Sequence, residues 1–435
     1  MKKLSCFFFS LIIAVSALSV PALAYKPTFD THAKAAILYN VDTDTVVYED
    51  NADKRMYPAS LTKIMVAVLL VEKNEKLEDL TLTVSQEIYE TYRYSDAVIA
   101  GFETGEKVNG HDLLAYTMVK SCADAAALVA EYVAGSESAF VEMMNKKAAE
   151  LGMKNTHFEN CHGLHDANHY STARDMCILT KYAMQYSLIT DVVKVARYTT
   201  KNDITLAATN LLIDPTSGYY YQYATGFKTG YTNEAGRCLA STATYDGMTY
   251  ISVLLGCPPQ ENSLIDRYEF TDTAELFRWA FNNFSYRSVL KKTETVDSIP
   301  IDYSWDYDTV NIRPQKEVYA LIPTDADEST IEVKTEYVKK KLEAPVKKGT
   351  AVGVIKVYYA GKQIGKTAAV VPQSVEGSQM LKVLTGAKRF LIKYKNYFLG
   401  GLAVIVLLII VFIAVTVRLN SKKKKYGRVR HYKRF

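Results

Sequence analysis

The sequence predicts an α+β fold with an antiparallel sheet, followed by a small all-β domain and a C-terminal transmembrane helix. Three observations lead to this prediction. Strand patterns give way to helical patterns near residue 60 and return near residue 224, before one more amphipathic helix. Residues 291–372 contain short β runs and no helical pattern. Residues 397–417 carry no charge and are long enough to cross a bilayer.

The first domain, predicted over residues 25–290, has its clearest local patterns at its strand-rich ends. Residues 34–50 predict two strands about a tight turn. Residues 236–256, GRCLASTATYDGMTYISVLLG, predict two more strands joined at Asp246-Gly247, a strong hairpin dipeptide. Helical patterns dominate the chain between these two regions, and residues 264–284 predict the amphipathic helix that closes the domain.

The two ends of the chain differ from this globular body. Residues 1–24 combine two lysines, a short apolar stretch and the exit Ala-Leu-Ala, which predicts a cleavable secretory signal rather than an uncleaved anchor. Residues 291–372 predict a small β-sandwich-like domain, and residues 373–396 a juxtamembrane stalk or interfacial helix. The transmembrane helix, residues 397–417, then leads into a basic tail, residues 418–435.

The charges around the predicted span fix its expected orientation. Residues 418–435 hold nine Lys and Arg and no acid, against five positive charges just before the span. The positive-inside rule therefore predicts a cytoplasmic tail and a body outside the membrane. The formal net charge of +5 becomes −6 for residues 25–417 once the two signal lysines and the nine tail charges are removed. An acidic body argues against nucleic acid as a partner.

Five cysteines remain in the body after the predicted removal of the signal. They are widely spaced, and five is an odd number too small for a disulfide scaffold in a chain of this size. Most are expected to be free thiols, with one bridge left open, among Cys122, Cys161, Cys177, Cys238 and Cys257.

The residues that carry chemistry begin with the stretch YPASLTKIMVA, residues 57–67. Ser60 and Lys63 are three residues apart at the start of an apolar helix, so they share one helix face. This spacing alone is weak evidence. It gains weight from Ser121, which begins SCAD in a helical region, and from Lys228 in the stretch GFKTGYT, because S-x-x-K, a middle serine triplet and K-T-G form one catalytic motif set.

A serine hydroxyl needs a base to become a nucleophile, and a lysine can serve only when it is neutral. Desolvation of Lys63 and the nearby cation of Lys228 would both favour the neutral amine. The backbone amides of Ser60 and Tyr231 are predicted to surround an oxyanion, where each donor contributes about 3–4 kcal/mol to the barrier. Lys228 and Thr229 are predicted to hold a substrate carboxylate.

Residues 34 to about 372 resemble the low-molecular-mass penicillin-binding proteins, the D-alanyl-D-alanine carboxypeptidases of bacterial cell walls. The resemblance extends beyond the three short motifs, since several longer blocks also match the family: PASLTKIM, LGMKNTHFENCHGL, HYSTARDM, TGFKTGYTNEAGRCLASTA and PVKKGTAVGVIKVYYAGKQIG. It implies a DD-peptidase/β-lactamase-like catalytic domain, a β-sandwich-like second domain and attachment to the bacterial cell membrane.

The resemblance also implies roles for individual residues. Ser60 is the expected acyl-ester nucleophile, Lys63 its proton acceptor, Ser121 a proton relay, and Lys228 with Thr229 a substrate-binding pair. The expected substrate is the peptidoglycan pentapeptide that ends in D-Ala-D-Ala, and β-lactams are the expected covalent inhibitors. No cofactor and no metal are implied.

Two departures keep alternatives open. The middle triplet of the family is usually Ser-x-Asn, but alanine stands at position 123 here, so a catalytically weak penicillin-binding scaffold or sensor is the alternative function. A β-lactamase is disfavoured by the second domain and the anchor. The segment from Cys161 to His169 contains residue types that bind zinc, but His162 falls in the HGL block of the family, which implies no metal there.

Overall fold

The computed structural model describes residues 27–259 and 267–427, so the predicted signal segment and most of the basic tail lie outside the described residues. The described chain forms two compact units. The first runs to Arg287 and also contains Tyr319–Thr330 and Tyr359–Gly361. The second contains Ser288–Val318, Ile331–Tyr358 and the chain from Lys362 onward.

A five-stranded antiparallel sheet forms the centre of the first unit. Its strand order is β2-β1-β9-β8-β7, so β7 is an edge strand. The strands are β1 (Ala35–Asn40), β2 (Thr45–Asp50), β7 (Ala224–Thr232), β8 (Gly236–Tyr245) and β9 (Met248–Cys257). The predicted hairpin is confirmed: Tyr245 pairs with Met248, and both turn residues have positive φ, +50° at Asp246 and +74° at Gly247, as a two-residue hairpin turn requires.

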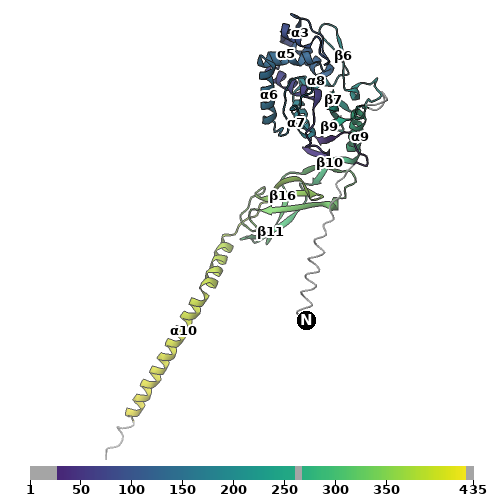
Figure 1. Ribbon diagram of the computed structural model, residues 1–435. Coiled ribbons are helices and arrows are strands. Elements are labelled where there is room, and N and C mark those ends of the chain that lie inside the picture. Colours follow the sequence, from purple (N-terminus) through teal and green to yellow (C-terminus); the bar gives the residue numbers. More distant parts are fainter. Residues whose placement is uncertain (1–26, 260–266, 428–435) are drawn as a thin grey trace, which may run out of the picture. The chain divides into compact units, whose positions relative to one another are not determined.

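Helices cover both faces of this sheet, as Figure 1 shows for α5 to α8 on one side of β9 and α9 on the other. Successive residues of β1 alternate between two cores: Ile37 packs with the larger helical group, and Leu38 packs with α9. The prediction of an α+β fold is confirmed. The helices are α2 (Lys63–Lys73), α3 (Gln86–Tyr92), α4 (Gly110–Ala115), α5 (Ala123–Ala134), α6 (Glu137–Glu150), α7 (Ala173–Ala183), α8 (Ser187–Val193) and α9 (Tyr268–Asn283).

Shorter elements connect these helices and strands. Three are 3₁₀ turns, η1 (Ala59–Thr62), η2 (Leu77–Asp79) and η4 (Leu211–Ile213), and one is a π-helical turn, η3 (Tyr116–Lys120). Two small antiparallel pairs complete the unit, β3 (Thr81–Thr83) with β4 (Lys107–Asn109) and β5 (Arg197–Thr199) with β6 (Thr205–Ala207).

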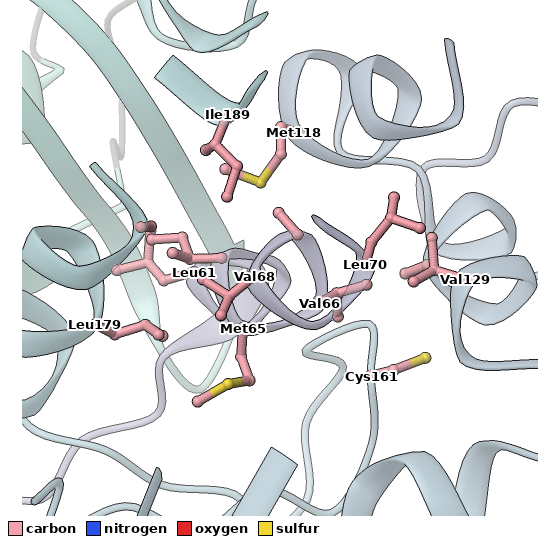
Figure 2. Close-up of a cluster of buried hydrophobic side chains, with 14 of the residues drawn as sticks. Leu61, Met65, Val66, Val68, Leu70, Met118, Val129, Cys161, Leu179 and Ile189 are labelled. Carbon is pink, nitrogen blue, oxygen red and sulfur yellow. The ribbon is translucent and has the colours of Figure 1, made fainter. Parts of the chain in front are cut away.

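The helix α2 is the central helix of the larger core. Every residue from Lys63 to Val71 is buried, so the helix has no solvent face in its first two and a half turns. Figure 2 shows its apolar side chains meeting those of the surrounding helices and loops, among them Met118, Val129 and Ile189. A lysine at the start of such a helix therefore enters a desolvated environment.

The second unit is all-β before its final helix, as the sequence predicts. Its six-stranded sheet has the order β14-β16-β17-β12-β11-β15, and β10 pairs separately with β13. A tight turn at Ala360-Gly361 joins β16 to β17, both turn residues having positive φ. The strands are β10 (Phe284–Leu290), β11 (Asp297–Asp302), β12 (Thr309–Pro314), β13 (Val318–Pro323), β14 (Ile331–Tyr337), β15 (Leu342–Glu343), β16 (Ala351–Tyr359) and β17 (Lys362–Val370); η5 (Glu328–Thr330) is a further 3₁₀ turn.

The final helix, α10 (Gln379–Gly427), includes most of the predicted stalk and the whole predicted span without a break (Figure 1). Within the described residues, Gln379–Ser421 is long and apolar enough to cross a membrane, and none of its most apolar window is buried against protein. It is therefore a candidate membrane helix by length and composition.

Candidate active site

Ser60 lies in the 3₁₀ turn η1 that leads into α2. Pro58 precedes the turn, where its fixed φ suits a helix start. Lys63 is the first residue of α2, and its Nζ lies 3.1 Å from Ser60 Oγ and 2.6 Å from the carbonyl oxygen of His162. The structure thus places the hydroxyl and the amine on one face, at hydrogen-bond distance, as the spacing in the sequence predicts.

Burial changes the acidity of Lys63. The residue is 2% exposed, and loss of water around the ammonium lowers its pKa to about 8. The charges of Cys161, Cys122 and Asp124 act in the opposite direction but are smaller effects. Roughly a tenth of the Lys63 amine is therefore neutral at pH 7, which is enough for a base that is regenerated in every cycle.

Ser121 stands at a break between helices, so its expected place inside a helical region is wrong. The turn η3 ends at Lys120, α5 begins at Ala123, and Ser121 between them has a left-handed φ of +71°. The next acidic residue, Asp124, accepts hydrogen bonds from the amides of Ala100 and Gly101 at 2.9–3.0 Å. Its carboxylate thereby holds the loop before α4 beside the cavity that Ser121 lines.

The K-T-G residues lie on the edge strand β7, and their side chains divide between its two faces. Thr229 and Tyr231 line the same cavity as Ser60, and Thr229 donates a hydrogen bond to Thr209 Oγ1 at 2.7 Å. Lys228 is fully buried and does not line the cavity; its Nζ donates to the carbonyl of Thr229. Burial, and secondarily the charge of Lys63, hold the pKa of Lys228 well below its usual value.

Two glycines allow the three segments to meet. A Cβ added at Gly230 of β7 would lie 3.0 Å from the backbone nitrogen of Ser60. A Cβ added at Gly163, in the loop after His162, would lie 2.1 Å from the carbonyl oxygen of Ala59. The turn that carries Ser60 is therefore enclosed by backbone on both sides, and its amide is within reach of the strand edge.

Replacing Gly163 by alanine is expected to reduce the free energy of unfolding by about 2–4 kcal/mol. The reasons are its φ of +81° and the overlap of the new methyl group with Ala59. Chemical denaturation measures the change. Gly152→Ala is the matched control, because Gly152 has a φ of +78° but no atom within 4 Å of the added Cβ. Equal losses in the two variants would contradict the close approach.

The cavity at this junction has a volume of about 480 Å³. Of the predicted site residues, Ser60, Lys63, Ser121, Thr229 and Tyr231 line it. Its lining also includes a group that the sequence did not single out, Arg237, Arg267 and Glu269. The carboxylate of Glu269 lies 2.6 Å from Arg267 and 3.6 Å from Arg237, which leaves this group one net positive charge. Arg237 lies within one of the family blocks, but its spacing gave no reason to select it.

The alternative zinc site in the segment from Cys161 to His169 gains no support. The side chain of His169 is engaged with Thr62 and the amide of Glu159, and His162 Nδ1 accepts from the amide of Leu164. Residues 27–259 and 267–427 contain no group of three or more side chains placed to hold a metal ion. The five body cysteines are buried and unpaired.

Comparison with known proteins identifies the class to which this fold and cavity belong. A family profile described as D-alanyl-D-alanine carboxypeptidase matches residues 21–258, more than half of the chain. A second profile, described as the C-terminal domain of penicillin-binding protein 5, matches residues 284–377. The chain therefore belongs to the D-alanyl-D-alanine carboxypeptidase family, and the resemblance seen in the sequence is confirmed.

Individual relatives agree with this assignment. The chain is 29% identical to D-alanyl-D-alanine carboxypeptidase DacF of Bacillus subtilis, over 81% of this chain and 88% of that protein. It is 30% identical to DacC of Escherichia coli, over 85% and 90% of the two chains. Penicillin-binding protein 5 of Haemophilus influenzae superposes with a TM-score of 0.63 and 28% identity, over 81% of this chain and 100% of that structure.

Proposed function

We propose that this protein is a serine-type D-Ala-D-Ala carboxypeptidase that removes the terminal D-alanine from peptidoglycan stem peptides. The observation that carries the proposal is the 3.1 Å contact between Lys63 Nζ and Ser60 Oγ in a cavity bounded by β7. A hydroxyl beside a partly neutral amine is the arrangement needed for covalent catalysis. Membership of the family supplies the reaction class.

In the proposed reaction, the neutral amine of Lys63 accepts the proton of Ser60 as Oγ bonds to the carbonyl carbon between the two D-alanines. The amides of Ser60 and Tyr231 stabilise the oxyanion. The C–N bond then breaks, the leaving amine takes a proton from Lys63 with Ser121 as relay, and D-alanine departs. Water hydrolyses the remaining ester on Ser60, which restores the hydroxyl and releases the tetrapeptide.

Positive charge in and beneath the cavity supports a substrate that ends in a carboxylate. Thr229 can donate to this carboxylate from the cavity wall, and the net positive group around Arg237 attracts it from the lining. Lys228 would contribute through the electrostatic potential of the strand rather than by direct contact, because its side chain is fully buried. β-Lactams would acylate Ser60 by the same route.

The candidate membrane helix and the basic residues after it support an enzyme anchored once in the bacterial cell membrane, with the catalytic body outside and the tail in the cytoplasm. In this location the body can reach peptidoglycan. An acidic body in this compartment does not favour nucleic acid as a partner.

Release of D-alanine from a diacyl-D-Ala-D-Ala peptide tests the proposal. The purified ectodomain should release D-alanine with turnover, and the Ser60→Ala variant should not. Release that does not exceed that of the variant would reject the proposed function. Rapid hydrolysis of penicillin by the same preparation would instead favour a β-lactamase.

The alternative function, a penicillin-binding scaffold or sensor with little turnover, is motivated by Ala123. This residue is 1% exposed at the start of α5, and its amide donates to the carbonyl of Val98 beside the cavity. On the scaffold hypothesis, Ala123→Asn should raise peptide turnover by roughly one to two orders of magnitude, because it supplies a missing polar contact in a desolvated site. Steady-state kinetics measures the change.

Ala123→Leu is the control for this variant, because it adds volume without an amide. A gain with asparagine and none with leucine would support the scaffold reading of the unaltered protein. Brisk turnover by the unaltered protein, with no gain from asparagine, would contradict it.

A further inference from the structure

The peptide bond that joins Ala59 to Ser60 is held at its carbonyl side by a buried chain of hydrogen bonds. The hydroxyl of Thr62 donates to the carbonyl oxygen of Ala59 at 2.7 Å. The same hydroxyl oxygen lies 2.8 Å from Nε2 of His169, which reaches it from more than one hundred residues further along the chain. Thr62 is fully buried and His169 is 2% exposed, so water does not compete for these contacts.

The direction of this chain of hydrogen bonds follows from the far side of the imidazole. The amide of Glu159 donates to His169 Nδ1 at 3.2 Å, so Nδ1 is an acceptor. Burial lowers the pKa of His169 to about 4, and the ring is therefore neutral at pH 7. A neutral ring that accepts at Nδ1 carries its proton on Nε2. His169 thus donates to Thr62, and Thr62 donates to Ala59.

The backbone at Ala59 needs such support. Its φ of +47° is left-handed, a conformation that residues with a Cβ disfavour. A trans peptide is planar, and its carbonyl oxygen and N–H point in opposite directions. A hydrogen bond that fixes the carbonyl of Ala59 therefore also fixes the direction of the N–H of Ser60, on the opposite edge of the same plane.

We propose that His169 and Thr62 are positioning residues that orient and polarise the Ser60 N–H as an oxyanion donor. The inference rests on the proposed function, because it needs an oxyanion at that amide. Donors aligned in series strengthen one another, so the bond accepted by Ala59 makes the Ser60 N–H a better donor. The effect is largest when charge develops on the substrate oxygen, which is the transition state rather than the bound substrate.

A purely structural role for the two side chains makes a different prediction. It would lower the fraction of protein that is folded, but the folded fraction would acylate at the normal rate. The rate constant of a single-exponential acylation at saturating penicillin does not depend on how much folded protein is present. This rate constant therefore separates positioning from stability.

The test uses Thr62→Val, which removes the hydroxyl at nearly constant volume, and Thr62→Ser, which retains it. We expect Thr62→Val to slow acylation by a reporter penicillin roughly ten- to hundredfold, and Thr62→Ser to stay within about threefold. In the acyl-enzyme, the ester carbonyl of Thr62→Val should stretch at a higher infrared frequency, because its oxygen accepts a weaker hydrogen bond. His169→Gln can restore an N–H donor and should be faster than His169→Leu.

Two results would overturn the inference. One is equal acylation rate constants and equal ester frequencies in the unaltered protein and Thr62→Val. The other is the absence of any acyl-enzyme in the unaltered protein, which would reject the proposed function as well. The first result leaves the proposed function intact, so the two failures can be distinguished.

Discussion

Replacing Ser60 by alanine is expected to abolish covalent attachment of a β-lactam and to slow peptide turnover roughly 10⁴-fold or more. The hydroxyl of Ser60 is 3.1 Å from the amine of Lys63, and an ester cannot form without it. Intact-protein mass spectrometry after exposure to penicillin measures the attachment. The unaltered ectodomain should gain the mass of one penicillin, and the variant should gain none.

Ser138→Ala is the matched control for this experiment. Ser138 is exposed on α6, and its loss should leave attachment unchanged. A full mass gain in Ser60→Ala would show that another residue is the nucleophile. Ser121 would then be the next candidate, because it lines the same cavity.

Replacing Lys63 by methionine is expected to slow acylation of Ser60 about 10³-fold. Methionine fills a similar buried volume and carries no charge, so the variant should fold, but it cannot accept a proton. Stopped-flow acylation by a reporter penicillin measures the rate. An acylation rate within a few-fold of the unaltered protein would exclude Lys63 as the base.

The pH dependence of acylation provides an independent check of the same assignment. Only the neutral amine accepts a proton, and the pKa of Lys63 is about 8. Below this value the rate should rise close to tenfold per pH unit, and above it the rate should level off. The Lys63→Met variant should lack this rise. A rate for the unaltered protein that falls between about pH 6 and about pH 8 would contradict a lysine base.

The parts of the fold that depend on neighbouring residues could be predicted from the sequence. The Asp246-Gly247 turn needs two residues that tolerate positive φ, and this requirement is visible in the dipeptide itself. The contact between Ser60 and Lys63 follows from helical spacing in the same way. The all-β second unit follows from the absence of helical periodicity in residues 291–372.

The features that sequence reasoning missed depend on tertiary packing. The break at Ser121 arises because η3 must end before α5 begins, and no glycine or proline marks that place. The burial of Lys228 depends on which face of β7 packs on the core, which a single strand does not reveal. The group formed by Arg237 and Glu269 joins β8 to α9, two elements that the local pattern does not connect.

The position of β7 at the edge of its sheet has a consequence for what the protein can accept. An edge strand has backbone groups with no partner in the sheet, so it is a template for one more strand. A ligand that presents an extended, linear backbone can complete the sheet beside Thr229 and Tyr231, whereas a helical or tightly cyclised peptide cannot. Selection by chain shape would therefore act before any side chain of the ligand is recognised.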